Sequence, residues 1–168
     1  MIVESFYPDE WVDSAYVIPY EDLYAAGYRG IIYDIDNTLV PHGAPADDRA
    51  RALFKRLKAI GFDCCLLSNN KQPRVDMFNK DIGVHTICNA HKPGKEGYRM
   101  AMKEMGTNKK NTLFIGDQLF TDVWGAKRCG IRNILVKPIH PKEEIQIVLK
   151  RRLEWIVLFF YKKQAHKS

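Results

Sequence analysis

The chain has 168 residues, a hydrophobic fraction of 46%, a charged fraction of 27% and a formal net charge of +6. These values are typical of a globular protein, and they predict one domain over residues 1–168. No segment has the roughly 18 consecutive apolar residues of a membrane-spanning helix, and the N-terminus lacks the pattern of a secretory signal. The cysteines lie in apolar stretches without a CxxC pair, so we expect free thiols and a cytoplasmic protein, not disulfides or a zinc site.

The positive net charge favours an anionic partner, such as a phosphate ester, a nucleic acid or an anionic membrane. The sequence has no aromatic-rich basic run and no recognised nucleic-acid motif, so nucleic acid is not the expected partner. The oligomeric state stays open.

Residues 1–29 predict a lead-in that packs on the domain, with helical turns over Pro8–Ala15 and Tyr20–Ala26. A strand over 30–34 and a helix over 47–60, ended by Gly61, follow. The later elements are expected in this order: a strand over 62–67, a helix over 73–80, a strand over 84–88, a helix over 94–105, a strand over 112–115, a helix over 119–129 and a strand over 131–136. Strands that alternate with helices at this spacing predict parallel pairing with right-handed crossovers. The expected fold class is therefore α/β, a three-layer sandwich with a five-stranded, mainly parallel, Rossmann-like sheet.

The first strand ends in two aspartates, Asp34 and Asp36, that are one residue apart. Because side chains alternate along a strand, both are expected to point the same way. Carboxylates held that close repel each other, which predicts a metal ion, a lysine or both beside them. The alternative is an ordinary turn, in which Asp and Asn are common.

The same end of the first four predicted strands delivers polar side chains, and ligands of open α/β sheets lie beyond this end. Individually, Ser68 and Asn69 could form a turn, Lys92 could be a solvated lysine, and Asp122 could be a surface residue. Their convergence favours one site. The expected site residues are Asp34, Asp36, Thr38, Ser68, Asn69, Lys92, Asp117 and Asp122.

These residue types suit phosphoryl transfer. Asp34 can attack phosphorus and form an aspartyl-phosphate, and Asp36 can serve as general acid and base. Lys92 and Ser68, with Thr38 and Asn69 beside them, can bind the phosphoryl oxygens. Mg²⁺ prefers carboxylate oxygens, which Asp34 and Asp117 offer, with Asp122 as support.

The motifs resemble those of the haloacid dehalogenase-like phosphatases. Asp34-Ile35-Asp36-Asn37-Thr38 is similar to motif I, Ser68 to motif II, Lys92 to motif III, and the segment from Gly116-Asp117 to Asp122 to motif IV. The resemblance implies that Asp34 is the nucleophile and Asp36 the acid and base, whose backbone carbonyl also binds Mg²⁺. It further implies that Lys92 and Ser68 bind phosphate and that Asp117 binds the metal.

The segments from Thr38 to Ser68 and from Ser68 to Lys92 are too short for a cap domain. The site is therefore expected to be open unless another subunit covers it. An open site favours a phosphate carried by something large, such as a lipid in a bilayer, a protein side chain or a nucleic-acid end. The order of motifs resembles the capless, YqeG-type branch of subfamily IIIA, which includes phosphatidylglycerophosphate phosphatases. That resemblance makes phosphatidylglycerophosphate the expected substrate. The alternatives are a phosphatase of a soluble phosphometabolite or phosphoprotein, and a non-catalytic phosphate-responsive binding protein.

Residues 142–168 predict a basic amphipathic helix and tail that begin after Pro141 and stay helical to about Phe160. Such helices can lie on anionic membranes, but the favoured interpretation is a final helix packed on the sheet with a basic tail. Contact of its end with lipid at the inner face of the membrane stays open. The apolar stripe comprises Ile145, Val148, Leu149, Ile156, Phe159 and Phe160, and the flanking basic residues are Lys150, Arg151, Arg152, Lys162 and Lys163.

Overall fold

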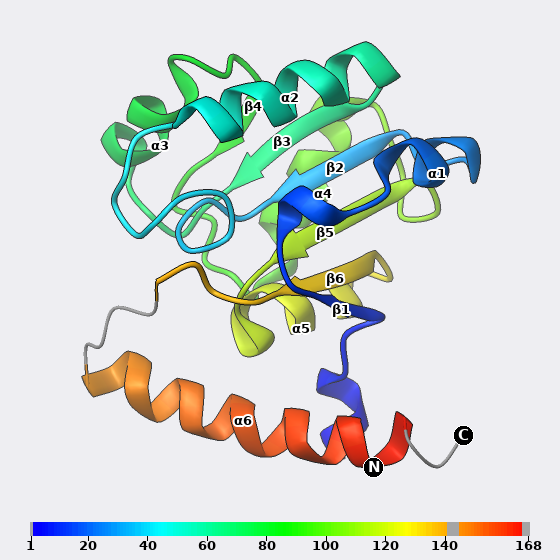
Figure 1. Ribbon diagram of the computed structural model, residues 1–168, viewed down its shortest axis with the longest axis vertical. Helices are drawn as coiled ribbons and strands as arrows, with labels where there is room; N and C mark the ends of the chain where they lie inside the picture. Colours follow the sequence, from blue (N-terminus) through cyan, green and yellow to red (C-terminus); the bar gives the residue numbers. More distant parts are fainter. Residues whose placement is uncertain (1, 141–144, 166–168) are drawn as a thin grey trace.

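The computed structural model describes residues 2–140 and 145–165. Its centre is a six-stranded sheet in which every neighbouring pair is parallel, in the order β1-β6-β5-β2-β3-β4 (Figure 1). The strands are β1 (Glu10–Val12), β2 (Gly30–Tyr33), β3 (Asp63–Leu67), β4 (His85–Ile87), β5 (Thr112–Gly116) and β6 (Arg132–Val136).

Helices connect these strands and cover both faces of the sheet. The α-helices are α1 (Tyr20–Ala25), α2 (Asp48–Ile60), α3 (Gln72–Asn79), α4 (Lys95–Met105), α5 (Trp124–Arg128) and α6 (Ile145–Ala165). Two 3₁₀ turns, η1 (Ile2–Phe6) and η2 (Ala15–Val17), lie near the N-terminus, and a π-helical turn, η3 (Leu119–Val123), precedes α5. The boundaries of α2 follow from its sequence, because the Asp47 carboxylate accepts from the Ala50 amide at 2.8 Å and Gly61 adopts a φ of 118° at the other end.

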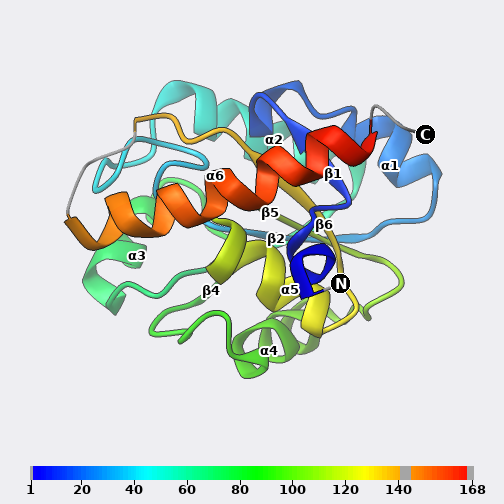
Figure 2. The ribbon, with the colours of Figure 1, turned by 90° about the horizontal axis from the view of Figure 1, so that it is seen from below.

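Alternate residues of the central strand β2 enter two separate cores. Ile31 and Tyr33 pack with α1, α2 and α3, whereas Ile32 packs with α4 and α5. Because both faces of the strand are covered, β2 is apolar throughout rather than alternating. Helices therefore lie on both sides of the sheet (Figures 1 and 2), which confirms the predicted three-layer α/β class.

The predicted count of five strands is wrong, because the sheet has a sixth. Residues Glu10–Val12 form the edge strand β1, which pairs with β6 from Glu10↔Ile134 to Val12↔Val136. The helical turn predicted over Pro8–Ala15 does not form. This three-residue strand is specified by its pairing with a distant partner and by contacts such as Arg132 to Glu10 at 2.7 Å, which local periodicity does not reveal.

The last helix, α6, lies beyond the β6–β1 edge and below it in Figure 1. Its inner side packs through Val157 and Leu158 against η1, η3 and β6, in a small core with Leu119 and Leu135. The apolar stripe predicted to pack on the sheet instead faces outward at its described positions, since Leu149, Ile156, Phe159 and Phe160 are exposed. The expected start of the helix, residues 142–144, and the end of the tail, residues 166–168, lie outside the described residues.

No cap domain interrupts the segments between the motifs. The segment between Thr38 and Ser68 holds a loop, α2 and β3, and the segment between Ser68 and Lys92 holds α3 and β4. Within residues 2–140 and 145–165, no helix has the length and apolar character needed to cross a membrane.

Candidate active site

Three aspartates meet at the carboxyl end of the sheet. Asp34 follows β2, Asp117 follows the neighbouring β5, and Asp122 lies in η3 directly after it. One carboxylate oxygen of each lies within 4.8 Å of the others. The predicted convergence of these three residues is therefore confirmed by their positions. We call them the aspartate cluster.

Lys92 places its ammonium inside the aspartate cluster. The Nζ atom donates to Asp34 Oδ1 at 2.8 Å and to Asp122 Oδ1 at 2.7 Å. Burial acts to lower the pKa of Lys92, but the charges of Asp122 and Asp34 raise it above its ordinary value. Lys92 is therefore a permanent cation at the centre of the site, and not the solvated lysine of the alternative interpretation.

Asn69 holds the backbone of Lys92 rather than pointing into the cluster. The Lys92 amide donates to Asn69 Oδ1 at 2.7 Å, and Asn69 Nδ2 donates to the Lys92 carbonyl at 3.2 Å. These bonds leave one N–H of the side-chain amide without an assigned acceptor, so its predicted contact with phosphate stays a prediction. Asn69 thus fixes the position from which Lys92 reaches the aspartates.

Two hydroxyl groups lie at the same end of the sheet. The Thr38 hydroxyl lies 3.0 Å from Asp34 Oδ2 and 3.3 Å from Asp117 Oδ1, so it can donate to either carboxylate. Ser68 directly follows β3, and its Oγ accepts from the Asn70 amide at 3.0 Å. The Ser68 hydroxyl keeps its own proton for another acceptor.

The π-helical turn η3 aims Asp122 back into the cluster. Its wide turn is closed by the Val123 amide, which donates to the Gln118 carbonyl at 3.2 Å, and the Gln118 amide donates to Asp122 Oδ2 at 3.1 Å. A Cβ atom at Gly116 would lie 2.6 Å from the same oxygen, so only glycine fits there. Burial first, and then the charge of Asp34, raise the pKa of Asp122 to about 6, against the opposing effect of Lys92.

Asp36 belongs to a separate group of contacts. Its carboxylate accepts from Arg74 Nη2 at 2.9 Å, from Asn70 Nδ2 at 2.7 Å and from the Gly43 amide at 2.7 Å. The expected repulsion between Asp34 and Asp36 is thus relieved by two cations, Lys92 on one and Arg74 on the other. Arg74, which α3 brings from a distant part of the chain, is not among the residues predicted for the site.

Arg151 of α6 also contacts the aspartate cluster, although it was predicted only as part of a basic flank. Its Nη2 donates to Asp117 Oδ2 at 2.6 Å, and its Nη1 donates to the Asp117 carbonyl at 3.1 Å. Burial and the charges of Asp34 and Asp122 hold the pKa of Asp117 well above its ordinary value, although Arg151 opposes them. No local pattern distinguishes Arg151 from the neighbouring Arg152, so only the packing of α6 reveals its role.

Glu154 anchors α6 one helical turn further on. This buried carboxylate accepts from the Leu119 amide at 3.0 Å and lies 3.6 Å from Arg151 Nη1. Burial raises the pKa of Glu154, while Arg151 and the amides of η3 act against that shift. Arg151 and Glu154 together connect α6 to the loop that carries Asp117 and Asp122.

The donor set suits a hard divalent cation. The aspartate cluster offers carboxylate oxygens only, from residues that the sheet and η3 hold close together. Oxygen donors of this kind are the ligands that Mg²⁺ prefers. The residues present therefore fit the metal that the motifs imply. The side chain of Asp36 is not part of this set.

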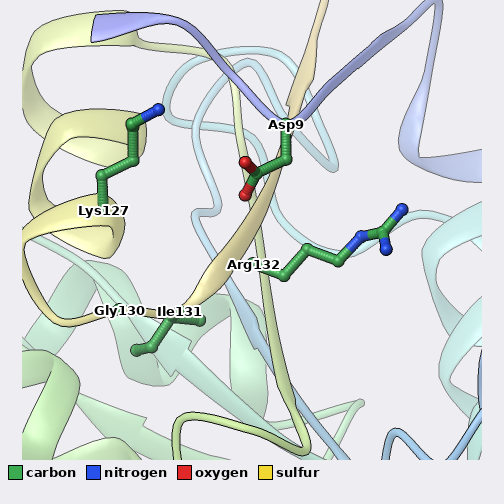
Figure 3. Close-up of a pocket in the computed structure, with 5 residues that line it drawn as sticks. All are labelled: Asp9, Lys127, Gly130, Ile131 and Arg132. Atoms are coloured by element: carbon green, nitrogen blue, oxygen red, sulfur yellow. The ribbon is translucent and has the colours of Figure 1, made fainter. Parts of the chain in front are cut away.

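A hollow of about 530 Å³ lies at the start of β6, at the end of the sheet opposite to the aspartate cluster (Figure 3). Lys127 Nζ in this hollow donates to the Tyr7 carbonyl at 2.7 Å, and Asp9 Oδ2 accepts from Asn133 Nδ2 at 2.9 Å. These bonds tie the lead-in to α5 and to β6, and the lining of the hollow contains no predicted site residue. Its lining residues are Asp9, Lys127, Gly130, Ile131 and Arg132.

Comparisons with known proteins show the family to which the chain belongs. The family described as haloacid dehalogenase-like hydrolase matches residues 42–130. A solved structure titled as a putative HAD superfamily (subfamily III A) hydrolase from Legionella pneumophila superposes with a TM-score of 0.54 at 19% identity, covering 77% of this chain and 74% of that one. At that identity the superposition speaks for the fold alone. The chain belongs to the haloacid dehalogenase-like hydrolases, and it is an enzyme of their phosphatase class.

Within this class the resemblance extends over almost the whole chain for one relative. The probable phosphatase YqeG of Bacillus subtilis is 35% identical over 167 residues, which cover 99% of this chain and 97% of the relative. The phosphatidylglycerophosphate phosphatase 1 of Arabidopsis thaliana is 28% identical over 84% of this chain. The chain spans only 44% of that plant relative.

Proposed function

We propose that the chain hydrolyses a phosphate monoester through an aspartyl-phosphate on Asp34, with Mg²⁺ as cofactor and phosphatidylglycerophosphate as substrate. The observation that carries the chemistry is the buried Lys92 ammonium, which contacts both Asp34 and Asp122 at the carboxyl end of the sheet. A fixed cation beside a nucleophilic carboxylate is what a phosphoryl group needs for binding and charge stabilisation.

In the first step an Asp34 oxygen attacks phosphorus, and the bond from phosphorus to the ester oxygen breaks. The departing oxygen takes a proton from the Asp36 carboxyl, so that the product leaves as an alcohol. The Lys92 ammonium and the Ser68 hydroxyl bind the phosphoryl oxygens. In the structure the Asp36 carboxylate contacts Arg74 and Asn70, so this role requires that it exchange these contacts when substrate binds.

In the second step the Asp36 carboxylate accepts a proton from water, whose oxygen attacks the same phosphorus. The bond from phosphorus to Asp34 breaks, which releases inorganic phosphate and restores the Asp34 carboxylate. Thr38, whose hydroxyl lies 3.0 Å from Asp34 Oδ2, holds the orientation of that carboxylate between turnovers.

Asp34 and Asp117, with the backbone carbonyl of Asp36, are the residues that would hold Mg²⁺. When bound, the ion supplies positive charge that offsets the charge of the phosphoryl oxygens. Asp122 keeps its contact with Lys92 and supports the site from behind. This assignment takes the Asp36 carbonyl from the family resemblance and the two carboxylates from the aspartate cluster.

The substrate proposal is supported by two features. The plant relative with 28% identity is a phosphatidylglycerophosphate phosphatase. The chain also lacks a cap between its motifs, so a phosphate at the surface of a bilayer can reach the cluster without a lid having to open.

The test is phosphate release with and without Mg²⁺ from a panel of substrates: phosphatidylglycerophosphate in micelles, phosphatidic acid, a sugar phosphate, a phosphopeptide and an aryl phosphate. We expect Mg²⁺-dependent release with a strong preference for phosphatidylglycerophosphate. Preference for the sugar phosphate or the phosphopeptide would replace the substrate and keep the chemistry. Absence of Mg²⁺-dependent release from every compound would instead favour a non-catalytic phosphate-binding protein.

A pair of aspartate variants makes the mechanism specific. Asp36→Asn should abolish turnover, because asparagine can neither give nor accept the proton, while Asp48→Asn on the exposed side of α2 serves as the matched control. If Asp36→Asn retained near-normal turnover, the acid and base would have to be a different residue.

A further inference from the structure

The outward side of α6 carries a row of exposed apolar side chains. Four of them lie on one side of the helix, because they are spaced by four, three and four residues: Leu149, Leu153, Ile156 and Phe160. Each of these four keeps between 48% and 59% of its surface exposed. Two aromatic rings stacked at a centroid distance of 5.7 Å flank the row. We call the following set the α6 surface: Leu149, Leu153, Trp155, Ile156, Phe159 and Phe160.

The rest of the described chain has no comparable patch. Of the ten large hydrophobic side chains exposed within residues 2–140 and 145–165, six belong to the α6 surface. The other four, Ile2, Val17, Met77 and Met100, lie on four different elements. Single exposed apolar residues are ordinary, whereas a contiguous patch marks an interaction surface.

The exposed charges of α6 are all positive over its described residues. Arg152, Lys162 and Lys163 are exposed around the apolar row. The acidic residue of this part of the helix, Glu154, is buried against the amides of η3 and offers no charge to a partner. The α6 surface therefore combines apolar and aromatic side chains with uncompensated positive charge.

This combination distinguishes between two occupants. The spacing of the row would also suit a helical pair with a second copy of the chain. In such a pair Arg152 and Lys163 would meet the same positive residues of the other copy, and no exposed acid on the described helix could balance them. An anionic bilayer offers both an apolar interior and negative charge, and tryptophan and basic side chains are typical of residues at its interface.

The α6 surface also lies beside the aspartate cluster. Arg151 and Glu154 hold the inner side of the same helix to Asp117 and to the start of η3. Between α6 and β6 runs a groove of about 340 Å³ whose lining includes Trp155 and Phe159 of the α6 surface as well as Asp117. A bilayer that covered Trp155 and Phe159 would therefore border the groove that Asp117 lines.

We propose that the α6 surface docks the protein on an anionic lipid bilayer. The inference rests on the proposed function for the identity of the substrate, but vesicle binding can be measured without any substrate. Docking would bring the aspartate cluster to phosphate groups at the bilayer surface, so that the open site needs no cap.

The experiment measures binding of the full chain to vesicles of phosphatidylcholine, with and without phosphatidylglycerol. We expect binding to the anionic vesicles alone. The double variant Leu153→Ser with Phe160→Ser should weaken it by at least about tenfold, from the apolar area lost. The matched control is Met77→Ser with Met100→Ser, whose side chains are exposed on α3 and α4 and should leave binding unchanged.

A charge variant tests the electrostatic contribution. Arg152→Gln with Lys163→Gln should weaken binding by about thirtyfold, since each basic residue near an anionic surface contributes ~1 kcal/mol. The matched control is Lys55→Gln with Lys58→Gln, on the exposed side of α2. Hydrolysis of a soluble aryl phosphate should stay the same in all four double variants.

The outcomes separate this proposal from the proposed function. Vesicle binding without hydrolysis of phosphatidylglycerophosphate would overturn the substrate and keep the docking surface. Equal binding to both kinds of vesicle, or undiminished binding by the α6 variants, would overturn docking. A solution dimer that the Leu153→Ser with Phe160→Ser variant dissociates would assign the α6 surface to a second copy of the chain.

Discussion

Two cations reach the aspartate cluster from different parts of the molecule, and one of them is much more deeply buried than the other. Lys92 is 3% exposed at its side chain, lies beside the sheet and contacts Asp34 and Asp122. Arg151 is 22% exposed at its side chain and reaches Asp117 from the peripheral helix α6. Both neutralise buried carboxylates, but only Lys92 is surrounded by the central core.

This difference in burial indicates which of the two cations is a fixed part of the site and which could be replaced by a metal ion. Without the Lys92 ammonium, the carboxylates of Asp34 and Asp122 would face each other with no cation between them. The backbone of Lys92 is in turn held in place by Asn69. Arg151 donates to the carboxylate of Asp117, a residue that the proposed metal would also use, and it is carried by a helix anchored at an edge of the sheet. We therefore interpret Lys92 as permanent and Arg151 as a counter-ion that competes with the metal.

The largest expected effect is on turnover and concerns the carboxylate paired with Lys92. Asp34→Asn should lower kcat at least about a thousandfold, because an amide cannot act as the attacking nucleophile. Its Tm should not fall, since Asp117 and Asp122 lose a like-charged neighbour. Phosphate release and thermal unfolding of the same preparation check both statements. Near-normal turnover would disprove the covalent mechanism.

The next effect is on stability and tests how much the buried Lys92 ammonium contributes to the free energy of unfolding. Lys92→Met should lower the free energy of unfolding by ~3–5 kcal/mol, because it leaves the buried Asp34 and Asp122 without their cation. Urea unfolding measures this loss, and Lys103→Met on the exposed side of α4 is the matched control. A loss no larger than that of the control would mean that the two aspartates do not depend on Lys92.

The pH dependence of the metal-free protein should report on Asp122. Its pKa is about 6 in the folded state and near the ordinary value of about 4 when unfolded, so the folded state binds more protons in between. The free energy of unfolding should therefore fall as pH rises through this window. The decrease should be smaller in Asp122→Asn, and the difference between the two proteins cancels surface contributions. Parallel pH profiles would show that Asp122 titrates normally.

Mg²⁺ should reduce the fall in the free energy of unfolding that accompanies rising pH. A divalent cation held by Asp34 and Asp117 adds positive charge beside Asp122 and favours its ionised form, so the rise in Tm on adding Mg²⁺ should be larger above the window than within it. Thermal unfolding with and without Mg²⁺ across the pH range measures this. A rise in Tm that did not depend on pH would place the ion away from the aspartate cluster.

The smallest expected effect concerns the exchangeable cation. Arg151→Gln should tighten the binding of Mn²⁺, used as a spectroscopic substitute for Mg²⁺, by about tenfold, because Asp117 then has no competing ion pair. Electron paramagnetic resonance of free Mn²⁺ measures the affinity directly, without reference to activity. Arg152→Gln is the control, since Arg152 is exposed on the same helix. Unchanged affinity would make Arg151 a structural anchor only.

The part of the site that follows from strand order was predictable from the sequence. In a parallel sheet, residues after neighbouring strands must meet at one end, so Asp34, Asp117 and Lys92 could be brought together without coordinates. The order of strands and helices gave the fold class for the same reason. The roles of these residues in catalysis remain proposals.

The contacts that sequence reasoning missed all depend on where distant elements pack. Arg74, Arg151 and Glu154 lie on helices whose rotation is set by burial of Phe78 or Val157, and nothing nearby in the sequence distinguishes them from solvated residues. The α6 stripe was assigned to the wrong side, since an apolar row predicts burial but not which partner covers it. Strand β1 was missed because three residues carry too little periodicity.

The π-helical turn η3 also restricts how this chain can change in length. The turn contains one more residue than an α-helical turn would, and that residue sets the rotation at which Asp122 faces Lys92. Deletion of a single residue between Asp117 and Asp122 would rotate the following side chains by about 100° and turn the carboxylate away. The count of residues in this segment is therefore as much a part of the site as their identities.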